Sequence, residues 1–412
     1  MNRHRPFRTR RLHGWRRMLG MTALLLACAQ PAPVSAQAAG GCQASPWPLW
    51  EVFERHFVQA DGRVLDASTA RQHSSSEGQS YGMFFALVAG NREAFDKMWR
   101  WSVDNLAGGN IADRLPAWYW GLADDGKWRV LDENSASDAD LWFVYALLEA
   151  ADRWRRPDYR RDALALLARI EAEEVAELPG LGSMLLPGRS HFVQADHLWQ
   201  LNPSYQPLPV LRRLAQASPQ GPWNRIADNS AAMLRATSPK GYVADWVAYR
   251  GASPSSGLFV ADPAKGDLGS YDAIRTYMWA GMAPAADPLA GPMLAAVGGM
   301  AGATASTGAP PEKIKVSSGR TEGTGPFGFS AALVPYFTAR NQPWLADMQR
   351  RRAQAMLADQ LQTASAQGRQ PPYYDVVLSL FGLGWADERY RFSNNGQMQL
   401  SWEKTCPPAN AR

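Results

Sequence analysis

The sequence predicts an all-α protein with short β-hairpin additions, and three observations support this fold class. Apolar residues recur at three- and four-residue spacings through the middle of the chain, as they do on one face of an α-helix. Alternation of apolar and polar residues, which is typical of strands, is confined to short pieces. The chain also shows no parallel-sheet pattern, dinucleotide fingerprint or phosphate-binding loop.

About a dozen helices are expected. In residues 138–154, for example, Leu141, Tyr145 and Leu148 share one helical face. The other predicted helices are residues 47–57, 77–89, 94–105, 159–175, 209–217, 223–236, 271–281, 288–298, 331–339, 344–363 and 374–384. Near the end of the chain, residues 389–392 and 397–400 flank Asn394-Asn395-Gly396, a turn sequence, and are predicted to form a hairpin.

Residues 1–36 are predicted to be a cleaved secretory signal. Seven arginines and no acid precede the apolar run 18–29, and Val34-Ser35-Ala36 offers a small-residue cleavage site. The apolar run is too short to span a bilayer comfortably. Two alternatives stay open: a lipoprotein cleavage site, which Leu25-Leu26-Ala27-Cys28 resembles, and twin-arginine export. The mature chain is expected to begin near Gln37, to be periplasmic or secreted, and to have no transmembrane segment.

The net positive charge of the whole chain comes from the arginines of this predicted signal. The formal net charge of +5 comes from 43 Lys and Arg against 38 Asp and Glu. Without the seven arginines, 36 bases face 38 acids, so the net charge becomes −2. No nucleic-acid or anionic-membrane partner is therefore predicted. Residues 37–412 show no charge block, linker or composition break, and they are expected to form a single catalytic domain and a monomer.

Two cysteines remain after the predicted cleavage, Cys42 near the start of the mature chain and Cys406 near its end. In an oxidising compartment such a pair is most simply a disulfide, which would bring the two ends of the chain together. The chain-entropy model gives about 5 kcal/mol of stabilisation for so long a loop. Two unpaired thiols are the alternative.

Three segments place a carboxylate in the first turn of a predicted helix, with a serine before it. They are residues 76–82 (SEGQSYG), 134–140 (NSASDAD) and 269–275 (GSYDAIR). In the first, Gly78 and Gly82 each weaken a helix by up to about 1 kcal/mol relative to alanine, which suggests that something approaches this backbone closely.

Each segment read alone is a helix cap. Ser75 or Ser76 can cap the first helix, and two serine–aspartate pairs of the second segment fit the capping-box spacing. These pairs are Ser135 with Asp138 and Ser137 with Asp140. The alternative is that the acids work together, which requires the helices to start at the same end of a barrel or bundle.

Carboxylates are the groups left to carry chemistry. The histidines of the mature chain, His56, His73, His191 and His197, have no metal-binding spacing, so neither a metal nor a cofactor is expected. No nucleophile-elbow motif is present. One protonated and one ionised carboxyl are what hydrolysis of a glycosidic bond requires. Aromatic residues such as Trp118-Tyr119-Trp120 and Tyr373-Tyr374 can stack on sugar rings, although most large aromatics fill cores.

The three segments resemble the signature regions of glycoside hydrolase family 8, namely SEGQSYG at 76–82, ASDAD at 136–140 and YDAIR at 271–275. Residues 115–118, 179–188, 202–205 and 381–385 resemble the branch of this family that is associated with bacterial cellulose synthesis. The resemblance implies an (α/α)6 barrel with a substrate groove across one end. It also implies a periplasmic, inverting endo-β-1,4-glucanase that acts on a β-1,4-glucan chain without a cofactor.

The resemblance assigns roles to six residues. Glu77 would be the general acid, and Asp272 the base that activates water. Asp138 would contact the central sugar and set the protonation of Glu77, and Arg275 would keep Asp272 ionised. The other two implied contacts are Tyr205, at the water or sugar site, and Trp118, as a stacking surface.

Other functions remain open at this point. A family relative could act on xylan or chitosan, and a non-catalytic glucan-binding or assembly factor could keep the groove without turnover. A cellulose synthase and export complex is a possible partner. One departure from the family pattern, Leu141-Trp142-Phe143-Val144, puts the shape of the sugar subsites in doubt more than the catalytic groups.

Overall fold

The computed structural model describes residues 46–405, and all of them lie in one compact unit, Cys42–Arg412. The predicted signal and cleavage site, and both Cys42 and Cys406, lie outside the described residues. Signal cleavage and the disulfide therefore stay predictions. Among the helices of residues 46–405, none has both the length and the apolar character that crossing a bilayer requires.

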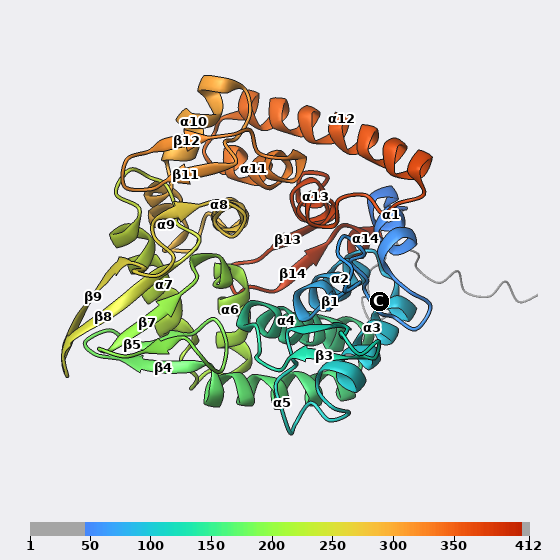
Figure 1. The fold of residues 1–412 in the computed structure, drawn as a ribbon, viewed down its shortest axis with the longest axis horizontal. Helices are drawn as coiled ribbons and strands as arrows, with labels where there is room; N and C mark the ends of the chain where they lie inside the picture. Colours follow the sequence, from blue (N-terminus) through green and yellow to red (C-terminus); the bar gives the residue numbers. More distant parts are fainter. Residues whose placement is uncertain (1–45, 406–412) are drawn as a thin grey trace, which may run out of the picture. The chain divides into compact units, whose positions relative to one another are not determined.

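Six helices form an inner ring, and neighbours in the ring follow one another along the chain (Figure 1). Phe381 of the last helix packs against Phe84 and Phe85 of the first, at 5.3 and 4.6 Å between ring centroids, which closes the ring. The inner helices are α2 (Ser76–Val88), α4 (Ser137–Trp154), α6 (Leu208–Ala217), α8 (Ala273–Met282), α11 (Phe327–Ala339) and α13 (Tyr373–Ala386).

Inner helices α2, α8, α11 and α13 are apolar on nearly all sides, as helices inside a large core must be. All ten residues of α8 are buried, and in α2 Glu77 alone is partly exposed, while its twelve other residues are buried. Large aromatic side chains meet at the centre of the ring. Between ring centroids, Trp142 lies 4.9 Å from Phe84 and 5.5 Å from Trp279. Trp279 in turn lies 5.1 Å from Phe381. The departure at residues 141–144 is thus core packing, since all four side chains are buried.

Outer helices cover this ring. In chain order they are α1 (Pro48–Phe57), α3 (Arg92–Leu106), α5 (Pro157–Glu173), α7 (Trp223–Thr237), α9 (Ala290–Ala296), α10 (Gly299–Thr307) and α12 (Pro343–Gln367). Outer α3, α5, α7, α9 and α12 each pack on an inner helix next to them in the chain, and α1 packs on α13. The predicted (α/α)6 barrel is confirmed. Helix α10 was not predicted, because its Gly-, Ala- and Thr-rich sequence has no apolar stripe.

Small antiparallel sheets are attached to the barrel. They are β1 (Ser74–Ser75), β2 (Tyr119–Leu122) and β3 (Trp128–Asp132); β4 (Val175–Leu178) and β5 (Gly182–Leu185); β6 (Val193–Gln194), β7 (Leu198–Leu201), β8 (Val247–Ser253) and β9 (Ser256–Ala261); β10 (Leu268–Gly269), β11 (Lys313–Lys315) and β12 (Arg320–Glu322); and β13 (Tyr390–Phe392) and β14 (Met398–Leu400). The C-terminal hairpin β13–β14 confirms the prediction. The four-stranded sheet was missed because Val247, Ala248 and Tyr249 are buried in a row and show no alternation.

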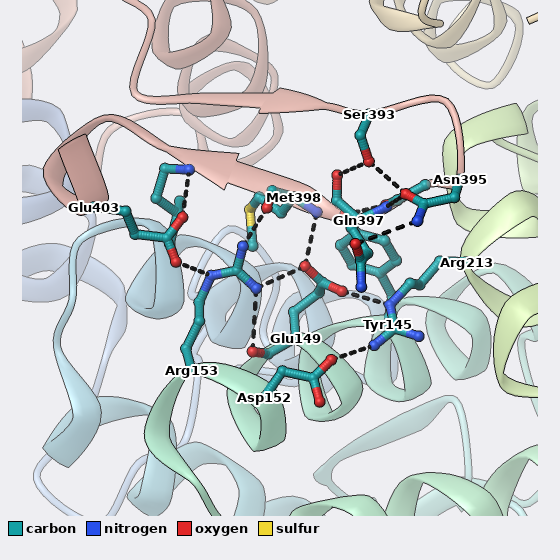
Figure 2. Close-up of polar contacts among 12 residues, drawn as sticks. Tyr145, Glu149, Asp152, Arg153, Arg213, Ser393, Asn395, Gln397, Met398 and Glu403 are labelled. Carbon is teal, nitrogen blue, oxygen red and sulfur yellow. Dashed lines mark hydrogen bonds and ion pairs between the residues drawn. The ribbon is translucent and has the colours of Figure 1, made fainter. Parts of the chain in front are cut away.

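A buried ion network fastens the hairpin to the barrel (Figure 2). Glu149, in the second half of α4, is fully buried. Its Oε1 accepts a hydrogen bond from Arg213 Nε of α6 at 2.5 Å, and its Oε2 accepts one from the Met398 N–H at 2.7 Å. Arg153 donates to Glu149 Oε2 at 2.8 Å and also pairs with Glu403 of the short helix α14 (Ser401–Thr405). One carboxylate therefore joins α4, α6 and the hairpin.

Candidate active site

Inner helices α2, α8, α11 and α13 begin around one cleft of about 390 Å³, and Asp138 in the first turn of α4 joins them through its bond with Arg275. Glu77, at the start of α2, and Asp272 and Arg275, at the start of α8, line this cleft. The starts of α11 and α13 contribute Pro326 and the segment Tyr373-Tyr374-Asp375. Residues nearly 200 positions apart in the sequence thus line one cleft. This is the arrangement that is required if the acids at the helix starts work together.

The start of α2 is held by a side-chain cap and by a backbone hydrogen bond. Ser75 Oγ accepts a hydrogen bond from the Gly78 N–H at 3.1 Å, and the Ser76 N–H donates to the Trp118 carbonyl at 3.0 Å. These contacts fix Glu77 in the first turn. A Cβ at Gly78 would lie 2.8 Å from the Tyr373 hydroxyl, and one at Gly82 would lie 2.8 Å from Met98 Sδ. The groups that closely approach these glycines are therefore side chains of the protein, Tyr373 and Met98.

The start of α4 lacks the predicted capping box. Its N-cap is Ala136, and no side chain caps the helix. Ser135 instead donates to Glu174 Oε1 at 2.5 Å, and the Ser137 hydroxyl has no partner within residues 46–405. Asp138, which is 1% exposed, accepts a hydrogen bond from the Ala139 N–H at 2.9 Å. The capping-box prediction is wrong because Ser135 bonds with Glu174 and Ser137 accepts no hydrogen bond from the first turn of α4.

The start of α8 is capped by Asp245, a residue that the sequence did not single out. Its Oδ1 accepts hydrogen bonds from the backbone N–H groups of Ser270, Asp272 and Ala273 at 2.7, 3.1 and 2.8 Å. Its Oδ2 accepts the Ser270 hydroxyl at 2.5 Å. A carboxylate is well placed at the positive end of a helix. Asp245 was missed because it lies 27 positions before Asp272, with no local spacing to link the two.

Arg275 connects the acids of two helices. Its Nη2 donates to Asp272 Oδ1 at 2.6 Å, and its Nη1 donates to Asp138 Oδ2 at 2.8 Å. Nη1 also lies 3.0 Å from the Tyr81 hydroxyl, which bonds to Asp138 Oδ2 at 3.2 Å. Charge-assisted hydrogen bonds of this kind fix geometry strongly. One guanidinium, 7% exposed, thus holds both carboxylates in place.

Glu77 and Asp272 occupy different electrostatic environments. Burial and the negative charge of Asp138 raise the pKa of Glu77 to about 7, although the helix backbone and Arg275 act against this shift. The Asp272 side chain is 32% exposed and paired with Arg275. The site therefore places a carboxyl group that keeps its proton up to nearly neutral pH, Glu77, beside one that is paired with a guanidinium, Asp272. Two carboxyl groups in different environments are what an acid and a base require.

Tyr205 and Trp118 are near the cleft but are not among the residues that line it. Tyr205, in the short 3₁₀ helix η1 (Pro203–Tyr205), lies under the Arg275 guanidinium at 5.5 Å. Burial beside Asp138 and Asp272 raises the pKa of Tyr205, so its hydroxyl keeps its proton. The Trp118 indole stacks on Tyr119 at 4.7 Å. Their proposed sugar contacts stay predictions.

Helix α13 contributes residues whose position in the site was not predicted. The Tyr374 hydroxyl donates to the Tyr271 carbonyl at 2.6 Å and so holds the residue before Asp272. Asp375 accepts a hydrogen bond from the Gly328 N–H at 3.0 Å, and burial raises its pKa to about 6. In the sequence, Tyr374 stood out only as part of an aromatic pair, and Asp375 only as an acid in an expected helix.

Asp138→Asn is expected to shift the alkaline limb of the pH profile of kcat/KM to lower pH by roughly one unit. The loss of the negative charge lowers the pKa of Glu77, and a general acid is active only while protonated. The measurement is a pH series of initial rates. Asp125→Asn, on an exposed turn, is the control and should leave the limb in place. An unmoved limb in Asp138→Asn would contradict this role.

Comparison with known proteins gives consistent matches. The family model of glycosyl hydrolases family 8 matches residues 23–388. An endoglucanase of Pseudomonas fluorescens (strain SBW25) is 52% identical over 371 residues, which cover 88% of this chain and 93% of that protein. An endoglucanase of Xanthomonas axonopodis pv. citri (strain 306) is 46% identical over 385 residues, covering 93% and 95%. The crystal structure of an endo-1,4-D-glucanase from Vibrio fischeri ES114 matches with a TM-score of 0.79 at 37% identity, covering 87% of this chain and 99% of that one.

Proposed function

The chain belongs to glycosyl hydrolases family 8, and from this premise we propose that it is an inverting endo-β-1,4-glucanase that hydrolyses internal bonds of cellulose. Relatives named endoglucanase that match nearly the whole chain support this activity. The observation that carries the proposal is that Glu77 and Asp272 line one cleft in different environments, one held protonated near neutral pH and the other paired with Arg275.

In the proposed mechanism Glu77 donates its proton to the glycosidic oxygen as the bond from that oxygen to the anomeric carbon breaks. A water molecule attacks the same carbon from the opposite face and passes a proton to Asp272. The water needs room, so an inverting pair stands about 6.5–9.5 Å apart. Both groups return to their starting states by exchanging protons with solvent.

Asp138, Arg275, Tyr205 and Trp118 complete the proposed site. Asp138 contacts the central sugar and keeps Glu77 protonated through its charge, while Arg275 keeps Asp138 and Asp272 in register. Tyr205 borders the water site because its ring lies under Arg275. Trp118 offers a flat face beside the start of α2 on which a sugar ring can stack.

The proposed setting is the periplasm or the cell exterior, after cleavage of the signal 1–36, with an accessory role in bacterial cellulose synthesis and export. The arginine-rich start and apolar run of the sequence support this address. A disulfide between Cys42 and Cys406 belongs to the same proposal, because it requires an oxidising compartment.

Proton NMR of a cello-oligosaccharide digest tests both substrate and stereochemistry. The first anomer to appear at the new reducing end should be α, because attack from the opposite face inverts the β-linkage. A first β anomer would contradict the inverting mechanism. Parallel digests of soluble β-glucan, xylan and chitosan test the substrate class, and release of no reducing ends from any of them would favour a binding or assembly role.

A further inference from the structure

The first turn of helix α4 carries, besides Asp138, the buried acid Asp140, which the proposed mechanism does not use. Asp140 and Glu174, the residue that follows α5, are both fully buried. Neither forms an ion pair with a basic side chain of residues 46–405, in contrast to the buried Asp138, which pairs with Arg275. Two carboxyl groups without a cation are costly to bury in ionised form.

The two carboxyl groups contact each other, and the contact requires a proton. Within the described part of the chain, both Asp140 oxygens and Glu174 Oε2 are buried and accept no hydrogen from an N–H or a hydroxyl, which leaves each carboxyl group the other as its hydrogen-bond partner. Ionised carboxylates have only acceptor atoms, so two of them cannot form such a bond. At least one of the pair is therefore protonated.

The neighbouring serine shows which group is the donor. Ser135 Oγ accepts the Arg189 N–H at 3.0 Å, so its own hydrogen is free to go to Glu174 Oε1 at 2.5 Å. Glu174 already accepts this hydrogen bond. Asp140 has no other donor near its oxygens, so it supplies the hydrogen of the shared bond.

The charges around the pair are mostly negative. Asp138 and Glu77 act on Asp140, and Asp138 and Glu173 act on Glu174. The basic side chains that bond beside the pair serve other acceptors: Arg275 of α8 binds Asp138 and Asp272, and Arg189, whose N–H bonds to Ser135, donates its Nη2 to the Glu133 carbonyl. Burial and these acids raise the pKa of Asp140, and burial raises that of Glu174 to about 8.

We propose that Asp140 and Glu174 share a retained proton and form a clamp that fixes the start of α4, and with it Asp138, against the end of α5. Asp140 is a positioning residue in this arrangement. The clamp takes the place of the missing side-chain cap at Ala136. The first turn of α4 then has two anchors: Asp138 to Arg275 at the cleft, and Asp140 to Glu174 behind it. The catalytic benefit rests on the proposed function, but the shared proton does not.

Amide and alkyl substitutions distinguish a shared proton from side-chain packing alone. In Asp140→Asn the amide N–H still donates to Glu174, and in Glu174→Gln the amide accepts from Ser135 and donates to Asp140. Both variants should keep kcat and KM near wild type at pH 7. Asp140→Ala removes one of the two hydrogen bonds that Glu174 accepts, and a displaced Asp138 should lower kcat by up to roughly 10²-fold. An Asp140→Asn variant as impaired as Asp140→Ala would overturn the proposal.

The pH dependence of stability gives a second readout that needs no activity. Wild type retains in its folded state a proton that the unfolded chain loses above a pH of about 4. Its unfolding equilibrium constant should therefore rise with pH from there up to the raised folded pKa, by about tenfold per unit and per retained proton. The amide in Asp140→Asn does not titrate. The logarithm of the unfolding equilibrium constant should therefore rise less steeply with pH in this variant, by a difference that corresponds to at least one retained proton.

Urea unfolding of wild type, Asp140→Asn and Glu174→Gln between pH 5 and pH 7 measures these slopes. Equal slopes in wild type and Asp140→Asn would overturn the shared proton. Should Asp140→Ala fail to fold, the two amide variants still decide the question. If the chain hydrolysed no glucan at all, the proposed function would fail, but the difference in slopes would still be expected.

Discussion

Glu77→Gln and Asp272→Asn are each expected to lower kcat on a cello-oligosaccharide by roughly 10²–10⁴-fold, because each removes a proton transfer in the transition state. The amides are close in shape to the carboxyls, so neither change should unfold the site. Release of reducing ends measures the rate, and calorimetric titration with the same oligosaccharide should show that binding is kept. Wild-type activity should fall as the pH rises through about 7, where Glu77 loses its proton.

Asp375→Asn is the matched control for these two variants. Asp375 lines the same cleft and also has a raised pKa, but its Oδ1 is engaged by the Gly328 N–H at the start of α11. Its amide should therefore keep most of the activity. The assignment of acid and base fails if Asp375→Asn is as inactive as the proposed pair, or if either member of that pair remains active.

The sequence predicted the parts of this site that are local. A carboxylate in a helix's first turn and an apolar run behind it are written within a dozen residues, so the starts of α2, α4 and α8 could be found. Apolar residues at three- and four-residue spacings predicted the helical class as well. The sequence could not predict that the first turns of α2, α4 and α8 lie close together. Their proximity depends on how the ring of helices closes through Phe381.

What the sequence did not predict depends on partners far along the chain. The helix that bears Asp272 is capped from Asp245, and the serine expected to cap α4 bonds with Glu174, 39 positions away. Serine and aspartate are good caps in isolation, but a folded protein can satisfy the same groups by tertiary contacts. Local rules therefore located the acids but assigned wrong partners to Ser135 and Ser137.

Glu149→Ala is expected to lower the free energy of unfolding by about 3–5 kcal/mol, since it breaks a buried ion pair on one side only. Arg213, which is 3% exposed, would lose its contact with Glu149, and the Met398 N–H would lose its acceptor. Urea unfolding measures the loss. Asp347→Ala is the control: it removes the pair of Asp347 with Arg351, whose side chains are 55% and 74% exposed, and should cost no more than about 1 kcal/mol.

The same variant tests whether the two ends of the barrel are independent. Glu149 follows Asp138 by eleven residues on one helix, about 16 Å at ~1.5 Å per residue, and it binds the hairpin, not the cleft. At a temperature where Glu149→Ala is still folded, its kcat should therefore stay near that of wild type. A loss of kcat in the folded variant would mean that the ion network around the hairpin also positions Asp138, and that α4 transmits strain along its length.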